Sequence, residues 1–71
     1  MSREFSFLIF CIELYRCDKN ISGKAALEIF KKFGIYNYIL KSYEALHVFG
    51  TKYLVEEFDS IVAEGGLKRQ S

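Results

Sequence analysis

The most apolar stretch of the chain runs from Phe5 to Tyr15 and reads FSFLIFCIELY. Folded as an α-helix, it is apolar around about half of its circumference or more, through Phe5, Phe7, Leu8, Ile9, Phe10, Cys11, Ile12, Leu14 and Tyr15. A helix this apolar is normally packed on several sides. We therefore expect a central helix from Ser2 or Arg3 to Cys17, with the rest of the chain packed around it.

A second helix is predicted from Gly23 to Phe33, where apolar residues recur at the helical spacing at Ala26, Ile29, Phe30 and Phe33. Ser22 precedes it and is a suitable N-cap, because its hydroxyl can accept a hydrogen bond from a free backbone N–H in the first turn. Gly34 follows it at the position where a helix end favours a left-handed residue. Both signals place the ends of this helix.

A third helix is predicted from Ile35 or Tyr36 to His47. Its apolar residues form two adjacent stripes, one of Ile39, Tyr43 and Leu46 and one of Tyr36, Leu40, Tyr43 and His47. Two apolar stripes on one short helix suggest that one belongs to the core and that the other is at least half exposed.

The fourth predicted helix runs from Lys52 to Ala63 or Glu64, with Gly50 ending the preceding element and Thr51 as its N-cap. Its apolar side is formed by Leu54, Phe58, Ile61 and Val62. The chain contains no proline, so helix is favoured nearly throughout. The sequence predicts an all-α fold, a compact bundle of about four short helices. We expect a single helical domain over residues 1–64 and a disordered basic tail over residues 65–71.

Composition adds a reason to expect a partner. In only 71 residues, 51% are hydrophobic and 17% are aromatic. A chain this short hides about 60% of the surface that its unfolded form exposes. Part of the apolar content is therefore expected on the surface, where it favours a protein partner or a homodimer.

The charge pattern argues against nucleic acid as the partner. The formal net charge is +1, without the clustered Lys and Arg that neutralise phosphates. Over residues 51–64 one lysine stands against four acids, which is typical of a solvated helix face.

The two cysteines, Cys11 and Cys17, are expected to be free thiols. They are six residues apart on one predicted helix and point in different directions, so they cannot form a disulfide with each other there. With no second Cys/His pair for a zinc site, no metal or cofactor is expected. No signal-peptide cleavage motif or membrane-spanning run is evident, and we expect a cytoplasmic protein.

No arrangement of residues indicates an enzyme. His47 is the one histidine, with Tyr43 and Glu44 within reach on the same helix, but neither supplies the nucleophile and orienting group of a catalytic dyad. A structural role at a helix end explains it more simply. The acids of the fourth helix lack a second cluster with which to form a metal or acid–base site.

The predicted helices on either side of Gly34 suggest a helix-turn-helix motif as an alternative, because glycine is common in such turns. The segment that would read DNA, YNYILKSYEAL, offers Asn37 and Lys41 but also Glu44. Phe30 is bulky where the motif usually has a small residue. We keep nucleic-acid binding as the second hypothesis.

The aromatic residues of the second half are the candidate partner-binding set: Tyr36, Tyr38, Tyr43, His47, Phe49 and Tyr53. Tyrosine offers a large contact area at low entropic cost and keeps a polar tip, which suits interface anchors. Some of these residues must belong to the core, and each fully buried one weakens the prediction.

Nearly the whole chain also resembles a known family. The matching runs are Ile21-Ser22-Gly23-Lys24-x-Ala26-Leu27-x-Ile29-Phe30, Phe33-Gly34-Ile35, Tyr38-Ile39 and Tyr43-x-x-Leu46-His47-x-x-Gly50-x-x-Tyr53-Leu54-Val55, with Asp59 behind them. They are similar to the small bacterial domain-of-unknown-function family three-seven-nine-one, over Glu4 to about Ile61. These residues are core and cap positions and carry no known chemistry.

The resemblance implies a short, cytoplasmic, all-helical bacterial protein whose gene is often placed beside one similar to ADP-ribosyltransferases. That arrangement suggests an antitoxin or an adaptor for the neighbouring protein. Combined with the aromatic set, it favours a non-enzymatic protein–protein interaction module, with a helix-turn-helix-like nucleic-acid-binding regulator as the alternative.

Overall fold

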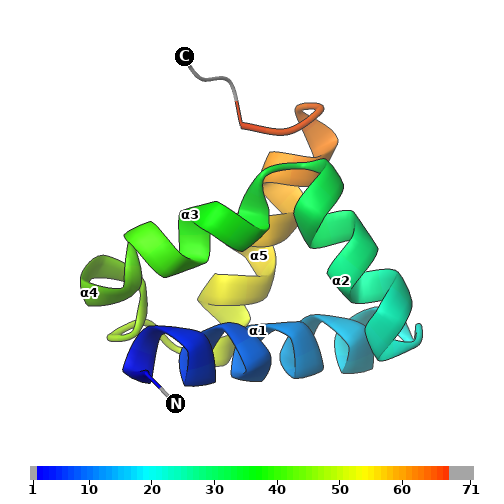
Figure 1. Ribbon diagram of the computed structural model, residues 1–71. Coiled ribbons are helices and arrows are strands. Elements are labelled where there is room, and N and C mark those ends of the chain that lie inside the picture. The colour runs from blue at the N-terminus through cyan, green and yellow to red at the C-terminus, as the bar shows by residue number, and fades with distance from the viewer. Residues whose placement is uncertain (1, 68–71) are drawn as a thin grey trace.

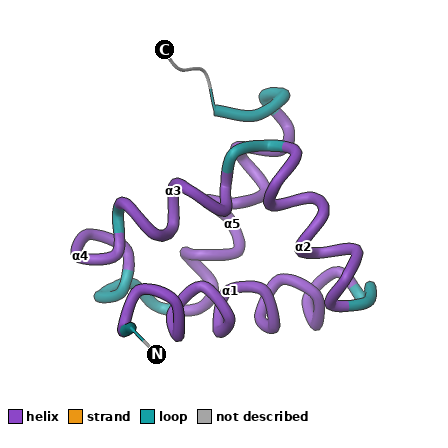
Figure 2. The backbone as a smooth tube through the Cα atoms, viewed as in Figure 1, coloured by secondary structure: helices purple, strands orange, loops and turns teal. Residues whose placement is uncertain are grey.

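The computed structural model describes residues 2–67, and within them it contains five helices and no strand. They are α1 (Arg3–Lys19), α2 (Gly23–Lys32), α3 (Ile35–Lys41), α4 (Tyr43–Leu46) and α5 (Thr51–Ala63). In Figure 1, α1, α2 and α3 form the three sides of a triangle, and α5 runs behind it. Helices make up nearly the whole described backbone, joined by short loops (Figure 2). The all-α prediction is confirmed.

Side-chain caps fix the first two helices. The Ser2 hydroxyl accepts from the Phe5 N–H at 3.0 Å, and the predicted cap Ser22 accepts from the Ala25 N–H at the same distance. α1 ends at Lys19, two residues farther than predicted, because Asn20 adopts the left-handed conformation that stops it. Ahead of α5, the prediction of a Thr51 cap was wrong: Thr51 is the first helical residue, with no side-chain cap bond.

The core is formed by one side of every helix, through Leu8, Cys11, Tyr15, Ala26, Phe30, Ile35, Ile39, Leu46, Leu54, Phe58 and Ile61. At its centre, the Phe30 ring lies 5.3 Å from the rings of both Tyr15 and Phe58. Tilted rings at this separation are a favourable aromatic geometry. The Cys11 thiol is fully buried among these groups, and burial raises its pKa to about 12, so it behaves as a small hydrophobic side chain.

Helix α1 is central in its contacts but not surrounded. It contacts α2, α3 and α5. Phe5, Ile9 and Phe10 nevertheless remain 39%, 45% and 46% exposed. The expectation that α1 is packed on several sides is met for only part of its surface, because so short a chain cannot enclose a helix of this length.

The third predicted helix is broken. Ser42 leaves the helical conformation, with φ −108° and ψ 22°, and separates α3 from the short α4. Its carbonyl accepts from the N–H groups of Ala45 and Leu46, which starts α4 in a new direction. Ile39 and Leu46 are both buried, so the predicted core stripe is retained across the break.

The segment after α5 turns back onto the corner between α2 and α3. The Leu67 N–H donates to the Phe33 carbonyl at 3.1 Å. Of the tail predicted over residues 65–71, residues 68–71 lie outside the described part of the chain. No helix between residues 2 and 67 combines the length and apolar character needed to cross a bilayer.

Candidate functional site

One group of aromatic residues lies where the start of α1 meets α4. The Tyr43 ring packs edge-on against Phe7 at 5.5 Å and stacks on the His47 ring at 4.4 Å. The Phe10 ring is 6.2 Å from that of Phe7. The Arg3 guanidinium lies over Tyr43, 5.5 Å from the ring centre. We call these five residues the α1–α4 cluster. It combines apolar rings with a cation, a composition common at protein interfaces.

His47 has a structural explanation within this cluster. Its Nδ1 is 2.9 Å from the Tyr43 carbonyl oxygen. A carbonyl can only accept, so Nδ1 carries the proton and donates it at the end of α4. No hydrogen bond joins the ring to a carboxylate or hydroxyl group among the described residues. Nor does the described part of the chain gather three or more Cys, His, Asp or Glu residues into a metal site.

A second group joins α3 to α5. The Tyr38 hydroxyl donates to Glu57 Oε2 at 2.7 Å. Burial raises the pKa of Tyr38, and the hydrogen bond to Glu57 adds to the increase. The Phe49 ring lies 4.3 Å from that of Tyr53, and both side chains are over 40% exposed. We call Tyr38, Phe49 and Tyr53 the α3–α5 cluster.

The six candidate residues thus lie in three places. Tyr43 and His47 belong to the α1–α4 cluster, and Tyr38, Phe49 and Tyr53 to the α3–α5 cluster. Tyr36 stands apart on α3, with the Lys31 ammonium 5.7 Å from its ring centre. None of the six is fully buried: the side chains of Tyr36, Tyr38 and Tyr43 are half-buried, and the other three are exposed.

The aromatic set missed other exposed apolar residues. These are Phe5, Ile9 and Phe10 on the first half of α1, and Val48, which is 70% exposed in the loop after α4. The signal for α1 was its wide apolar arc, which exceeds what three neighbouring helices can cover. The first half of α1, α4 and the 47–50 loop lie at the same end of the molecule (Figure 1). The name apolar end is used for the exposed large apolar side chains of these segments together with Tyr53, whose ring packs against Phe49: Phe5, Ile9, Phe10, Val48, Phe49 and Tyr53.

The predicted DNA-reading helix does not form as one element. The break at Ser42 leaves α3 with seven residues, Ile35–Lys41. Asn37 and Lys41 are exposed on it, whereas Glu44 lies on α4 and faces Arg3 at 3.8 Å. The face available to a duplex is therefore shorter than the sequence suggested.

Comparison with known proteins identifies a family whose function is not known. Neither the curated proteins nor the solved structures contain a significant match to this chain. A family model matches residues 6–64, which include all five helices apart from the first turn of α1. The chain therefore belongs to the family described as Protein of unknown function (DUF3791).

Proposed function

We propose that this protein is a non-enzymatic interaction module that binds a protein partner through its apolar end. The observation that carries the proposal is the concentration of exposed large apolar side chains there, on α1 and on residues 48–53. Leu67 is the one other large hydrophobic residue that is exposed in the described chain. Several exposed large apolar side chains at one end of a small protein are typical of an interaction site.

The arrangement suits interface anchors. Phe10 and Phe49 each keep more than two-fifths of their surface exposed, while neighbouring rings in their clusters restrict their motion. Side chains already held in place lose less conformational entropy on binding. Arg3 and Glu44 at the edge supply the polar rim that surrounds such anchors.

The family resemblance supplies the partner that we propose, the ADP-ribosyltransferase-like product of a neighbouring gene. The module acts as an antitoxin, covering the partner's active site, or as an adaptor that positions it. A bacterial cytoplasmic setting is part of this proposal, and the free thiols Cys11 and Cys17 are consistent with a reducing compartment.

The test is to express the chain alone and together with the neighbouring gene product, and to measure both by size-exclusion chromatography with light scattering. We expect a stable complex. Phe10→Ser should weaken it by about tenfold or more, as expected for an anchor residue. Cys17→Ser places the same residue at an exposed position at the other end of α1 and should leave it unchanged. A tight homodimer that does not bind the neighbour would instead assign the apolar end to self-association.

A nucleic-acid-binding regulator is the second candidate, favoured by one observation. Asn37 and Lys41 are exposed on α3, close to Lys31 and Lys32 at the end of α2. Duplex binding whose affinity falls steeply with added salt would support it, and absence of binding at low salt would exclude it.

A further inference from the structure

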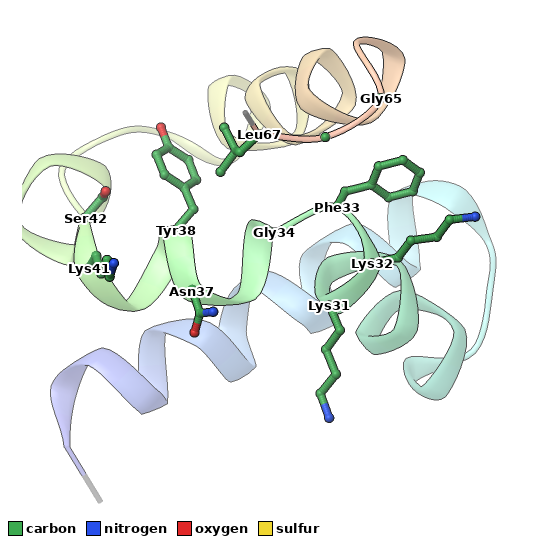
Figure 3. Close-up of a pocket in the computed structure, with 11 residues that line it drawn as sticks. Lys31, Lys32, Phe33, Gly34, Asn37, Tyr38, Lys41, Ser42, Gly65 and Leu67 are labelled. Atoms are coloured by element: carbon green, nitrogen blue, oxygen red, sulfur yellow. The ribbon is translucent and has the colours of Figure 1, made fainter. Parts of the chain in front are cut away.

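A groove lies at the corner between α2 and α3 and extends along α3 as far as Ser42. Its volume is about 530 Å³. One wall is formed by the end of α2 and by α3, and the other by residues 65–67 after α5 (Figure 3). Phe33, Tyr38 and Leu67 line it with apolar surface, and Leu67 is 44% exposed. None of the residues named as the apolar end lines this groove.

The second wall is held by backbone contacts. The Leu67 N–H donates to the Phe33 carbonyl, and Gly66, the residue before Leu67, has a φ of +108°. A Cβ at Gly66 would lie 3.3 Å from that same carbonyl oxygen, so this approach requires glycine. The groove is therefore a built feature of the chain's turn after α5.

The lining is strongly asymmetric in charge. Within residues 2–67, Lys31, Lys32 and Lys41 border the groove and no carboxylate does, although the whole chain carries a net charge of only +1. Glu57, which bonds to the Tyr38 hydroxyl, does not line the groove. The walls of the groove thus combine positive charge with the apolar surface of Phe33, Tyr38 and Leu67.

The lysines do not converge on one point. In Figure 3 the side chains of Lys31 and Lys32 extend outward in different directions from the end of α2. Their ammonium groups lie over the rings of Tyr36 and Phe33, at 5.7 and 5.5 Å from the ring centres. Spread positive charge without an arginine fork does not favour a single phosphate group. It matches carboxylates that are distributed along a chain.

We propose that this groove binds an acidic peptide segment of the partner protein, with one of its apolar side chains seated between Phe33 and Leu67. The proposal rests on the proposed function, to which it adds a second contact of opposite character. The apolar side chains in the walls favour a peptide over a nucleic acid, whose outer surface is phosphate and sugar. The lysines would speed association and select acidic partners.

The test uses labelled synthetic peptides and the full chain, and needs no identified partner. The first peptide alternates Asp and Glu with Leu, the second replaces the acids with Asn and Gln, and the third replaces Leu with Ser. A single-stranded oligonucleotide of similar length is the fourth probe. Fluorescence anisotropy gives the affinities at low and moderate salt, and amide chemical shifts locate the site.

We expect the acidic, Leu-containing peptide to bind most tightly, weakening with salt and shifting the amides of Gly34, Asn37, Ser42 and Gly66. Lys32→Gln with Lys41→Gln should reduce its affinity about fivefold. Lys24→Gln with Lys52→Gln removes the same charge elsewhere and should change it less than about twofold.

Several outcomes would overturn the assignment. Equal binding of the Asn and Gln peptide would exclude a role for charge, and equal binding of the Ser peptide would exclude a role for the apolar wall residues. Tighter binding of the oligonucleotide than of the acidic peptide would indicate that the groove is a nucleic-acid-binding site. Shifts confined to the apolar end, or no binding at low salt, would leave the proposed function standing and reject the groove. Failure of the neighbouring protein to bind, with the peptide still bound here, would reject the function instead.

Discussion

At the scale of single residues, two tyrosine hydroxyls tie helices to α5 by hydrogen bonds to carboxylates. Tyr38 donates to Glu57, and Tyr15 donates to Asp59 at 3.3 Å, where Lys19 also binds at 2.7 Å. Burial is the first cause of the raised pKa of both tyrosines, and the neighbouring carboxylate adds to it. Neither pairing was predicted, because spacing along the sequence does not show which residues from distant helices meet.

The raised pKa of Tyr38 predicts a loss of stability in alkali. The unfolded chain releases the tyrosine proton near pH 10, whereas the folded chain still holds it. This contribution is thus fully present below about pH 10 and is lost as the pH rises toward the folded-state pKa. Tyr38→Phe removes the titrating group, so its free energy of unfolding should fall less between neutral pH and about pH 11. Urea titrations of both proteins across that range measure the difference, and parallel curves would contradict it.

At the scale of elements, the sequence predicted the helices whose ends carry local signals. Ser22 and Gly34 act through their own backbone neighbourhood, and both occur where expected. Gly34 has φ +78°, a conformation that residues with a side chain rarely adopt. The break at Ser42 has no such signal. Directly after the break, Tyr43 packs against Phe7, and tertiary packing of this kind can override local helix propensity.

The contact between Tyr43 and Phe7 predicts how firmly α4 is held against the rest of the molecule. This four-residue helix, Tyr43–Leu46, is held by the burial of Leu46 and by the edge-on packing of Tyr43 against Phe7. Phe7→Ala removes that packing, so the amides of Leu46 and His47 should exchange with solvent several times faster, while those of α5 change little. Phe10→Ala is the matched control, because Phe10 has no ring contact with Tyr43 among the described aromatic pairs. Hydrogen exchange followed by NMR separates the two variants, and equal acceleration would refute the link.

At the scale of the whole molecule, the apolar content of the chain is divided between a core and an exposed end. Periodicity identified Phe30, Phe58 and Leu54 as core residues, and all three are buried. It did not show which side of α1 faces outward, because that side is as apolar as the other. Nor did it separate the half-buried Tyr36 from the exposed Tyr53. Those assignments depend on how α1, α2, α3 and α5 pack around a small core.

This division predicts opposite responses to the same substitution. A 71-residue domain has a total stability of about 4–10 kcal/mol. Phe30→Ala removes a fully buried ring that contacts both Tyr15 and Phe58, at a cost of about 3–5 kcal/mol. Phe49→Ala removes an exposed ring that contacts Tyr53 and should cost about 1 kcal/mol or less.

Thermal and urea denaturation can be followed by circular dichroism. We expect Phe30→Ala to be largely unfolded or only marginally stable, and Phe49→Ala to be nearly as stable as the natural chain. For partner binding by folded protein, we expect the opposite order: Phe49→Ala should weaken binding more than Phe30→Ala, because Phe49 belongs to the apolar end and Phe30 is buried. A large loss of stability in Phe49→Ala would mean that this ring supports the fold of the 47–50 loop. The exposed aromatic residues would then have a structural role, which would contradict the assignment of the apolar end as a binding surface.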